Sequence, residues 1–149
     1  MDRIAPYLLW IGHAGDGGDG PRLFENGIRA VVQVALEEPP LKPPRELVYP
    51  RFPLVDGGGN GGPLLRLTIF TVANLIEARV PTLVCCGAGM SRSPAVAAAA
   101  LAVVGGEPPE ACLRRVLAGR RGDVSPGLWS EILGVLSPPA GGPGTHRPV

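Results

Sequence analysis

One short stretch of the chain combines residue types that suit phosphate chemistry. It runs Val84-Cys85-Cys86-Gly87-Ala88-Gly89-Met90-Ser91-Arg92-Ser93-Pro94. Cys86 offers a nucleophilic sulfur, and Arg92 offers a planar fork of N–H donors that can hold two oxygens of one phosphate. The spacing alone is weak evidence, because in so arginine-rich a chain a Cys and an Arg at this spacing arise by chance about one time in four.

The residues between Cys86 and Arg92 strengthen the prediction, because they suit a loop that wraps an oxyanion. Small residues follow Cys86, so a ligand can approach the backbone N–H groups, and a helix expected to begin near Pro94 would add its positive end. These N–H groups and the guanidinium would also favour the thiolate form of Cys86. The predicted phosphate-binding residues are Gly87, Ala88, Gly89, Met90, Ser91 and Arg92.

The other cysteines and histidines do not indicate a metal site. The only histidines are His13 and His146, and the three cysteines, at 85, 86 and 112, do not form the framework of a disulfide-rich secreted domain. We therefore expect reduced thiols, no metal and no organic cofactor. Cys86 would be activated by its loop rather than by an imidazole.

Residues 86–94 resemble the signature loop of the protein tyrosine phosphatase superfamily, specifically its dual-specificity branch. Residues 51–56, Arg-Phe-Pro-Leu-Val-Asp, resemble the strand and general-acid loop of that branch and precede the cysteine, as they do there. In low-molecular-weight phosphatases the cysteine loop comes first in the sequence and the general acid comes later. The resemblance extends over roughly residues 4–136, although outside the two motifs it is one of general pattern.

The resemblance implies a role for each matched residue. Cys86 would attack phosphorus and form a cysteinyl-phosphate, while Arg92 and the N–H groups of residues 87–92 bind the equatorial oxygens. Asp56 would protonate the leaving oxygen and then act as base on the hydrolytic water. Ser93 matches a hydroxyl that hydrogen-bonds the nucleophile and helps the thiolate leave.

One departure from the family pattern keeps alternatives open. Cys85 stands where the family usually has a histidine that supports the loop and the thiolate. A catalytically weakened or inactive module that binds phosphate or phosphoproteins is therefore the alternative function. Arsenate reduction through a similar loop is a third possibility, with Cys85 and Cys112 as candidate resolving thiols.

The acid assignment also has rivals. Asp56 could be an ordinary turn residue before the glycine-rich run at 57–62, which we expect to be flexible and to let the acid loop close over substrate. Within that run, the resemblance suggests that Asn60 contacts the acid loop or the substrate. Weaker candidates for the acid are Asp16, Asp19 and Asp123.

Charge and loop composition narrow the substrate. The interior of the phosphate loop lacks the Lys or Arg with which phosphoinositide phosphatases meet extra phosphates, so phosphotyrosine proteins are expected, with phosphoserine and phosphothreonine as further candidates. A net charge of +1 argues against nucleic-acid and membrane partners. With no long apolar run, we expect a cytoplasmic monomer.

Strands and helices alternate along the chain and predict how these residues are positioned. Apolar segments predict strands at 7–11, 28–36, 47–54 and 82–85. Helices are predicted at 64–79, from apolar residues at helical spacing; at 93–104, apolar on every side and hence buried; at 108–118; and at 126–136, with Ser125 as N-cap.

This alternation predicts an α/β fold. We expect a mostly parallel central sheet flanked by helices on both faces, as in dual-specificity phosphatases. Residues 1–136 would form a single phosphatase domain, and the Pro/Gly-rich tail at 137–149 would be disordered, because it has almost nothing to bury.

Overall fold

The central strand of the sheet is β4 (Thr82–Cys86), and all five of its residues are buried. In the computed structural model, which describes residues 1–137, the strand order is β1-β2-β4-β3. The short β1 (Asp2–Arg3) runs antiparallel to β2 (Leu9–His13), whereas β2 and β3 (Ala30–Gln33) both pair with β4 in parallel. A strand flanked on both edges and covered on both faces is expected to be apolar throughout.

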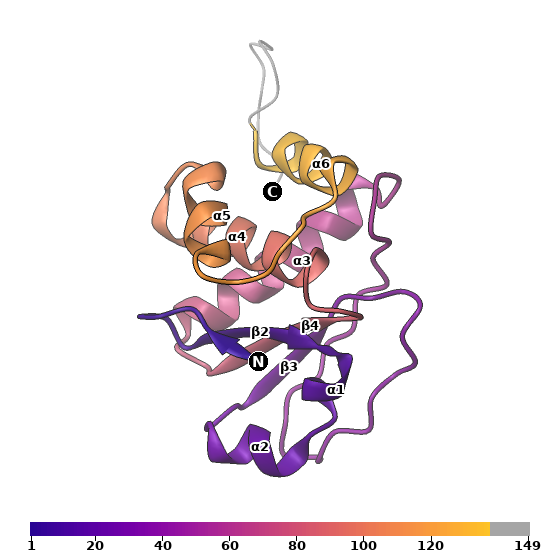
Figure 1. Ribbon diagram of the computed structural model, residues 1–149, viewed down its shortest axis with the longest axis vertical. Coiled ribbons are helices and arrows are strands. Elements are labelled where there is room, and N and C mark those ends of the chain that lie inside the picture. Colours follow the sequence, from indigo (N-terminus) through magenta and orange to yellow (C-terminus); the bar gives the residue numbers. More distant parts are fainter. Residues whose placement is uncertain (138–149) are drawn as a thin grey trace.

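Helices cover both faces of this sheet (Figure 1). On one face lie α3 (Gly62–Glu77), α4 (Arg92–Gly105), α5 (Pro109–Leu117) and α6 (Pro126–Leu136), and on the other lie the short helices α1 (Ala14–Gly17) and α2 (Gly20–Glu25). Two separate apolar clusters, one on each side, match this arrangement. The predicted mostly parallel α/β sheet with helices on both faces is confirmed.

Helix α4 is the central helix, and residues 92–102 are all buried. Much of its surface consists of alanine methyl groups, which let α3, α5 and α6 pack close to it. The prediction of a buried helix at 93–104 is therefore confirmed. Helix α6 has the predicted bounds, and the hydroxyl of Ser125 caps it by accepting a hydrogen bond from the N–H of Leu128 at 3.5 Å.

The predicted strand at 47–54 is wrong. This segment runs beside β3 but makes only two isolated parallel bridges, Ala30 to Val48 and Gln33 to Arg51. Pro50 and the proline at 53 lack the N–H groups that a continuous ladder requires. The neighbouring strand, predicted at 28–36, is shortened to Ala30–Gln33.

Two predictions concern the chain ends and the membrane. The tail predicted to be disordered lies, from residue 138 onward, outside the described residues. Within residues 1–137, none of the helices combines the length and the hydropathy needed to cross a membrane.

Candidate active site

The predicted phosphate loop connects the end of β4 to the start of α4, at the carboxyl edge of the parallel strands. Ligand sites of open α/β sheets lie at this edge. Cys86 ends β4 and is 2% exposed, and Arg92 begins α4 and is 6% exposed. Both line one cavity of about 220 Å³, whose other lining residues are Asp56, Ala88, Met90, Ser91 and Asp123.

The loop keeps its shape because it packs on the end of β2 and the start of α1. Gly89 has a φ of +76°, and a Cβ at this position would lie 2.9 Å from the carbonyl carbon and oxygen of Gly12. Only glycine fits both the positive φ and the close approach. Nearby, the N–H of Ala14 donates to the carbonyl of Gly87 at 3.2 Å, which fixes the other side of the loop.

Asp56 lies beside the phosphate loop, although it is 30 residues before Cys86 in the sequence. Its Oδ1 accepts a hydrogen bond from the Ser91 hydroxyl at 2.5 Å. The same hydroxyl accepts one from the N–H of Ser125, at the start of α6, at 2.9 Å. Ser91 therefore joins the predicted acid to the phosphate loop and to α6.

The rival carboxylates fare differently. Asp123 also lines the cavity, so it stays close enough to compete for the acid role. Asp16 accepts the N–H of His13 at 3.0 Å, and Asp19 accepts the N–H of Arg22 at 3.3 Å. Because these two carboxylates satisfy N–H groups at helix starts and do not line the cavity, they are poorly placed to act on a substrate.

The glycine-rich loop after Asp56 is anchored at its far end. The Asn60 side chain accepts from the N–H of Val55 at 2.7 Å and donates to the carbonyls of Val55 and Gly57 at 3.1 and 3.0 Å. Glu131 of α6 accepts the N–H groups of Asn60 and Gly59 at 3.1 and 2.7 Å, and these hydrogen bonds lower the pKa of Glu131. The expected contact between Asn60 and the acid loop is therefore present.

Arg92 has a protein partner that the sequence analysis missed. Its Nη1 donates to Oε1 of Glu37 at 2.6 Å and to the carbonyl of Leu54 at 2.9 Å, and its Nη2 donates to Oε2 of Glu37. This ion pair raises the pKa of Arg92 and lowers the pKa of Glu37 to about 2. Glu37 remains about half exposed, whereas Arg92 is buried.

The remaining edge of the Arg92 guanidinium is free. Its Nε is buried and has no hydrogen-bond partner among residues 1–137. A guanidinium can grip one carboxylate by its two Nη atoms and a second anion by the edge that includes Nε. The arrangement therefore leaves one buried donor of the Arg92 guanidinium without a partner among residues 1–137.

The expected parallel pairing of the strands could have indicated that Glu37 lies near Arg92. Strands β3 and β4 are parallel neighbours, so the segments after them emerge at the same edge of the sheet. Glu37 and Glu38 follow β3 just as the phosphate loop follows β4. Parallel topology therefore predicts that these two carboxylates lie near the phosphate loop and Arg92.

The structure resembles solved dual-specificity phosphatases over nearly its whole length. Human DUSP28 matches with a TM-score of 0.80 and 26% identity over 91% of this chain and 94% of that one. A mouse putative dual specificity phosphatase complexed with zinc tungstate matches at 0.78 and 27%, over 89% and 84%. In its fold and in its two sequence motifs, the chain is similar to the dual-specificity branch of the protein tyrosine phosphatase superfamily.

More distant solved structures share the fold. The human tyrosine phosphatase-like serine/threonine/tyrosine-interacting protein matches at a TM-score of 0.74 and 20% identity, over 90% of this chain and 93% of that one. No protein-family model and no curated protein sequence matches the chain. The similarity to the dual-specificity branch therefore rests on three-dimensional structure and on the two sequence motifs.

Within this dual-specificity phosphatase fold, Cys85 and Cys86 face opposite sides of the sheet. Successive strand residues alternate in direction, and the two cysteines belong to different apolar clusters. Burial raises the pKa of Cys85 to about 12, and burial also raises the pKa of Cys112. Two protonated thiols, one of them behind the sheet, argue against arsenate reduction through resolving cysteines.

Ser93 is also buried at the start of α4. Its hydroxyl donates to the carbonyl of Gly12 at 3.3 Å. No hydrogen bond to Cys86 is found within the described part of the chain, so the role of Ser93 beside the sulfur stays a prediction.

Proposed function

We propose that the chain is a cysteine-dependent phosphatase that hydrolyses phosphomonoesters, with phosphotyrosine in proteins as the main substrate and phosphoserine and phosphothreonine as further ones. The observation that carries this proposal is the cavity in which Cys86, Arg92 and Asp56 meet. A nucleophile, an oxyanion donor and an acid within one small cavity are the groups that such a reaction requires.

The first half of the reaction transfers phosphate to sulfur. The Cys86 thiolate attacks phosphorus, an S–P bond forms, and the P–O bond to the leaving group breaks. Asp56, protonated at this stage, gives its proton to the leaving oxygen. The N–H groups of the loop and the Nε edge of Arg92 hold the equatorial oxygens, and the dipole of α4 adds positive potential.

The second half releases phosphate. Water attacks the cysteinyl-phosphate while the Asp56 carboxylate takes its proton, and the S–P bond breaks to give inorganic phosphate and the thiolate. The hydrogen bond from Ser91 keeps the Asp56 carboxyl group beside the phosphate loop.

The test is hydrolysis of para-nitrophenyl phosphate from about pH 5 to about pH 8 in reducing buffer without added metal. We expect turnover by the native chain and none by Cys86→Ser. Cys112→Ser is the matched control, because Cys112 is an equally buried thiol on α5 and should leave turnover intact. Phosphotyrosine, phosphoserine and phosphothreonine peptides then rank the substrates.

A second candidate is a module that binds phosphorylated proteins without turnover. Cys85, in place of the family's usual histidine, is the observation that favours it. Phosphopeptide or tungstate binding by folded protein that hydrolyses no phosphate ester would support this candidate and reject the enzyme. Turnover that depends on Cys86 would exclude it.

A further inference from the structure

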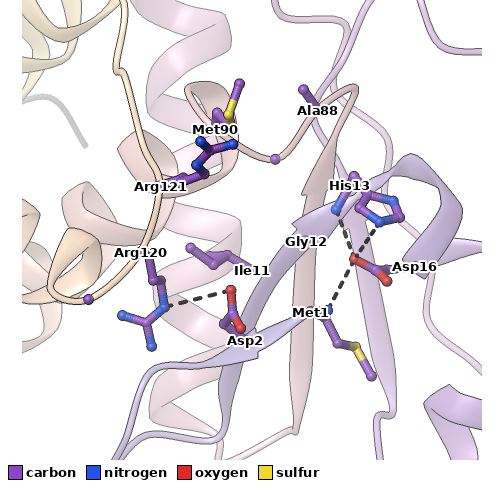
Figure 2. A pocket seen from close by; sticks show the side chains of 12 residues that line it. Met1, Asp2, Ile11, Gly12, His13, Asp16, Ala88, Met90, Arg120 and Arg121 are labelled. Carbon is purple, nitrogen blue, oxygen red and sulfur yellow. Dashed lines mark hydrogen bonds and ion pairs between the residues drawn. The ribbon is translucent and has the colours of Figure 1, made fainter.

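A second and larger cavity adjoins the phosphate loop. It has a volume of about 410 Å³, which is within the range of small-ligand sites. Ala88 and Met90 line both this cavity and the one that holds Cys86 and Arg92, so the loop separates two neighbouring hollows. Figure 2 shows the larger cavity, with Met90 and Ala88 at its upper rim and Ile11 and Gly12 between its two sides.

Most charges around this larger cavity are already matched. Arg120 donates to the carbonyl of Arg3 at 2.7 Å and lies 3.9 Å from the Asp2 carboxylate. Asp16 accepts the N–H of His13 and lies 3.6 Å from the Nε2 of the same residue. The dashed lines in Figure 2 mark such pairs on the two sides of the cavity. These contacts hold the walls in place, although the buried Nε of Arg120 makes no hydrogen bond within residues 1–137.

Arg121 is different. It is exposed, it lines the cavity, and its guanidinium makes no hydrogen bond or ion pair with any other residue in the range 1–137. Its loop is tied to the phosphate loop, because the N–H of Asp123 donates to the carbonyl of Met90 at 2.9 Å. In Figure 2 the Arg121 side chain lies beside Met90. Within residues 1–137, Arg121 is therefore a cation of this cavity without a charged partner, and it lies next to the site of phosphate chemistry.

We propose that this cavity is a substrate subsite for an anionic side chain close to the phosphorylated residue, with Arg121 as its partner. The inference rests on the proposed function and adds a preference among its substrates. A peptide whose phosphate enters the Cys86 cavity crosses the ridge at Met90 and places a neighbouring side chain beside Arg121. A carboxylate or a second phosphate meets the chemistry of a guanidinium, whereas a lysine is repelled.

The test measures affinity rather than turnover, so that it is independent of catalysis. In the Cys86→Ser background, phosphotyrosine peptides are compared that carry Asp, Ala, Lys or phosphoserine at each flanking position. We expect one position at which Asp or phosphoserine binds about three- to tenfold more tightly than Ala, and Lys more weakly. The stronger of the two anions then identifies whether the subsite takes a carboxylate or a second phosphate.

Variants of Arg121 decide the assignment. Arg121→Ala should remove the preference, and Arg121→Glu should reverse it in favour of Lys. The matched control is Arg114→Ala, an exposed arginine of α5 outside the cavity, which should retain the preference.

The results that would reject the subsite differ from the result that would reject the enzyme. Equal binding of all peptides, binding of none, or a preference that survives Arg121→Ala would overturn the subsite. Absence of para-nitrophenyl phosphate hydrolysis by the native chain would instead reject the proposed enzyme, while the ratio of peptide affinities would still judge the subsite.

Discussion

Asp56 is the residue whose assignment has the sharpest kinetic test. Asp56→Asn should lower the rate by about 10²–10⁴-fold for alkyl phosphates, whose leaving group needs a proton, and by less for para-nitrophenyl phosphate. Asp123→Asn is the matched comparison, because Asp123 lines the same cavity. Equal losses in the two variants, or a larger loss in Asp123→Asn, would contradict the assignment of the acid.

Glu37 is expected to position Arg92 rather than to touch the substrate. Glu37→Gln removes the charge that binds both Nη atoms of Arg92. The Nε edge of Arg92 should then be oriented less accurately toward the phosphate, and kcat should fall about tenfold. Removing a carboxylate beside an anion site should not raise the inhibition constant of inorganic phosphate. Glu38→Gln is the control, because Glu38 is the next carboxylate after β3 and makes no hydrogen bond or ion pair with Arg92 within residues 1–137. A raised inhibition constant with unchanged kcat would refute this role.

The pH dependence of the Glu37 contact has a definite sign. Because the folded-state pKa of Glu37 is lowered to about 2, the ion pair contributes fully above the ordinary value of about 4.3 and is lost as pH falls through about 2. A change of rate between about pH 5 and pH 8 would therefore come from other groups.

At the scale of elements, the phosphate loop depends on one glycine. Gly89→Ala combines a disfavoured positive φ with a backbone clash, and we expect kcat/KM to fall about 100-fold. Gly106→Ala at the end of α4 is the control, because its φ is +64° and no atom lies within 4 Å of the added Cβ. It should lower the free energy of unfolding by about 1 kcal/mol and leave kcat/KM unchanged. Similar kinetics for the two variants would disprove the role of the contact with Gly12.

The acid loop depends on α6. Glu131→Ala removes the acceptor of two loop N–H groups, so amide hydrogen exchange at Gly59 and Asn60 should accelerate and turnover of alkyl phosphates should fall about tenfold. The lowered pKa of Glu131 means that its contacts are intact above about pH 4.3 and are lost as pH falls further. Glu110→Ala, an exposed glutamate on α5, should change neither quantity. Unchanged exchange in Glu131→Ala would show that the loop is held by Asn60 alone.

These elements also explain what the sequence could and could not predict. Local motifs were sufficient to place Cys86 and Arg92 at the two ends of one loop and to give the bounds of α6, because a loop signature and an N-cap are formed by residues that are close in sequence. They were insufficient for Glu37 and Glu131, whose partners lie 55 and 71 residues away. The wrong strand at 47–54 had a local cause. The segment is apolar enough to suggest a strand, but its two prolines cannot donate to a continuous ladder.

On the scale of the whole molecule, ligand binding should be visible as stability. Filling the loop gives the buried Nε of Arg92 a partner, and phosphate at about 100 times its Kd adds about 2.7 kcal/mol, or roughly 5–10 °C in Tm. Arg92→Lys, which keeps the charge but not the fork, should lose most of this shift. An equal shift in both proteins would mean that phosphate binds elsewhere.

The alanine-rich surface of α4 bears on how freely the chain can change over evolution. Residues 95 and 97–100 are all alanines and fully buried, and the helix begins at Arg92. A methyl group can hardly be shortened, and a larger side chain would push α3, α5 or α6 outward and move the helix start with them. Mutational tolerance should therefore be low along this helix, far from any substrate, and high on the outward faces of its neighbours.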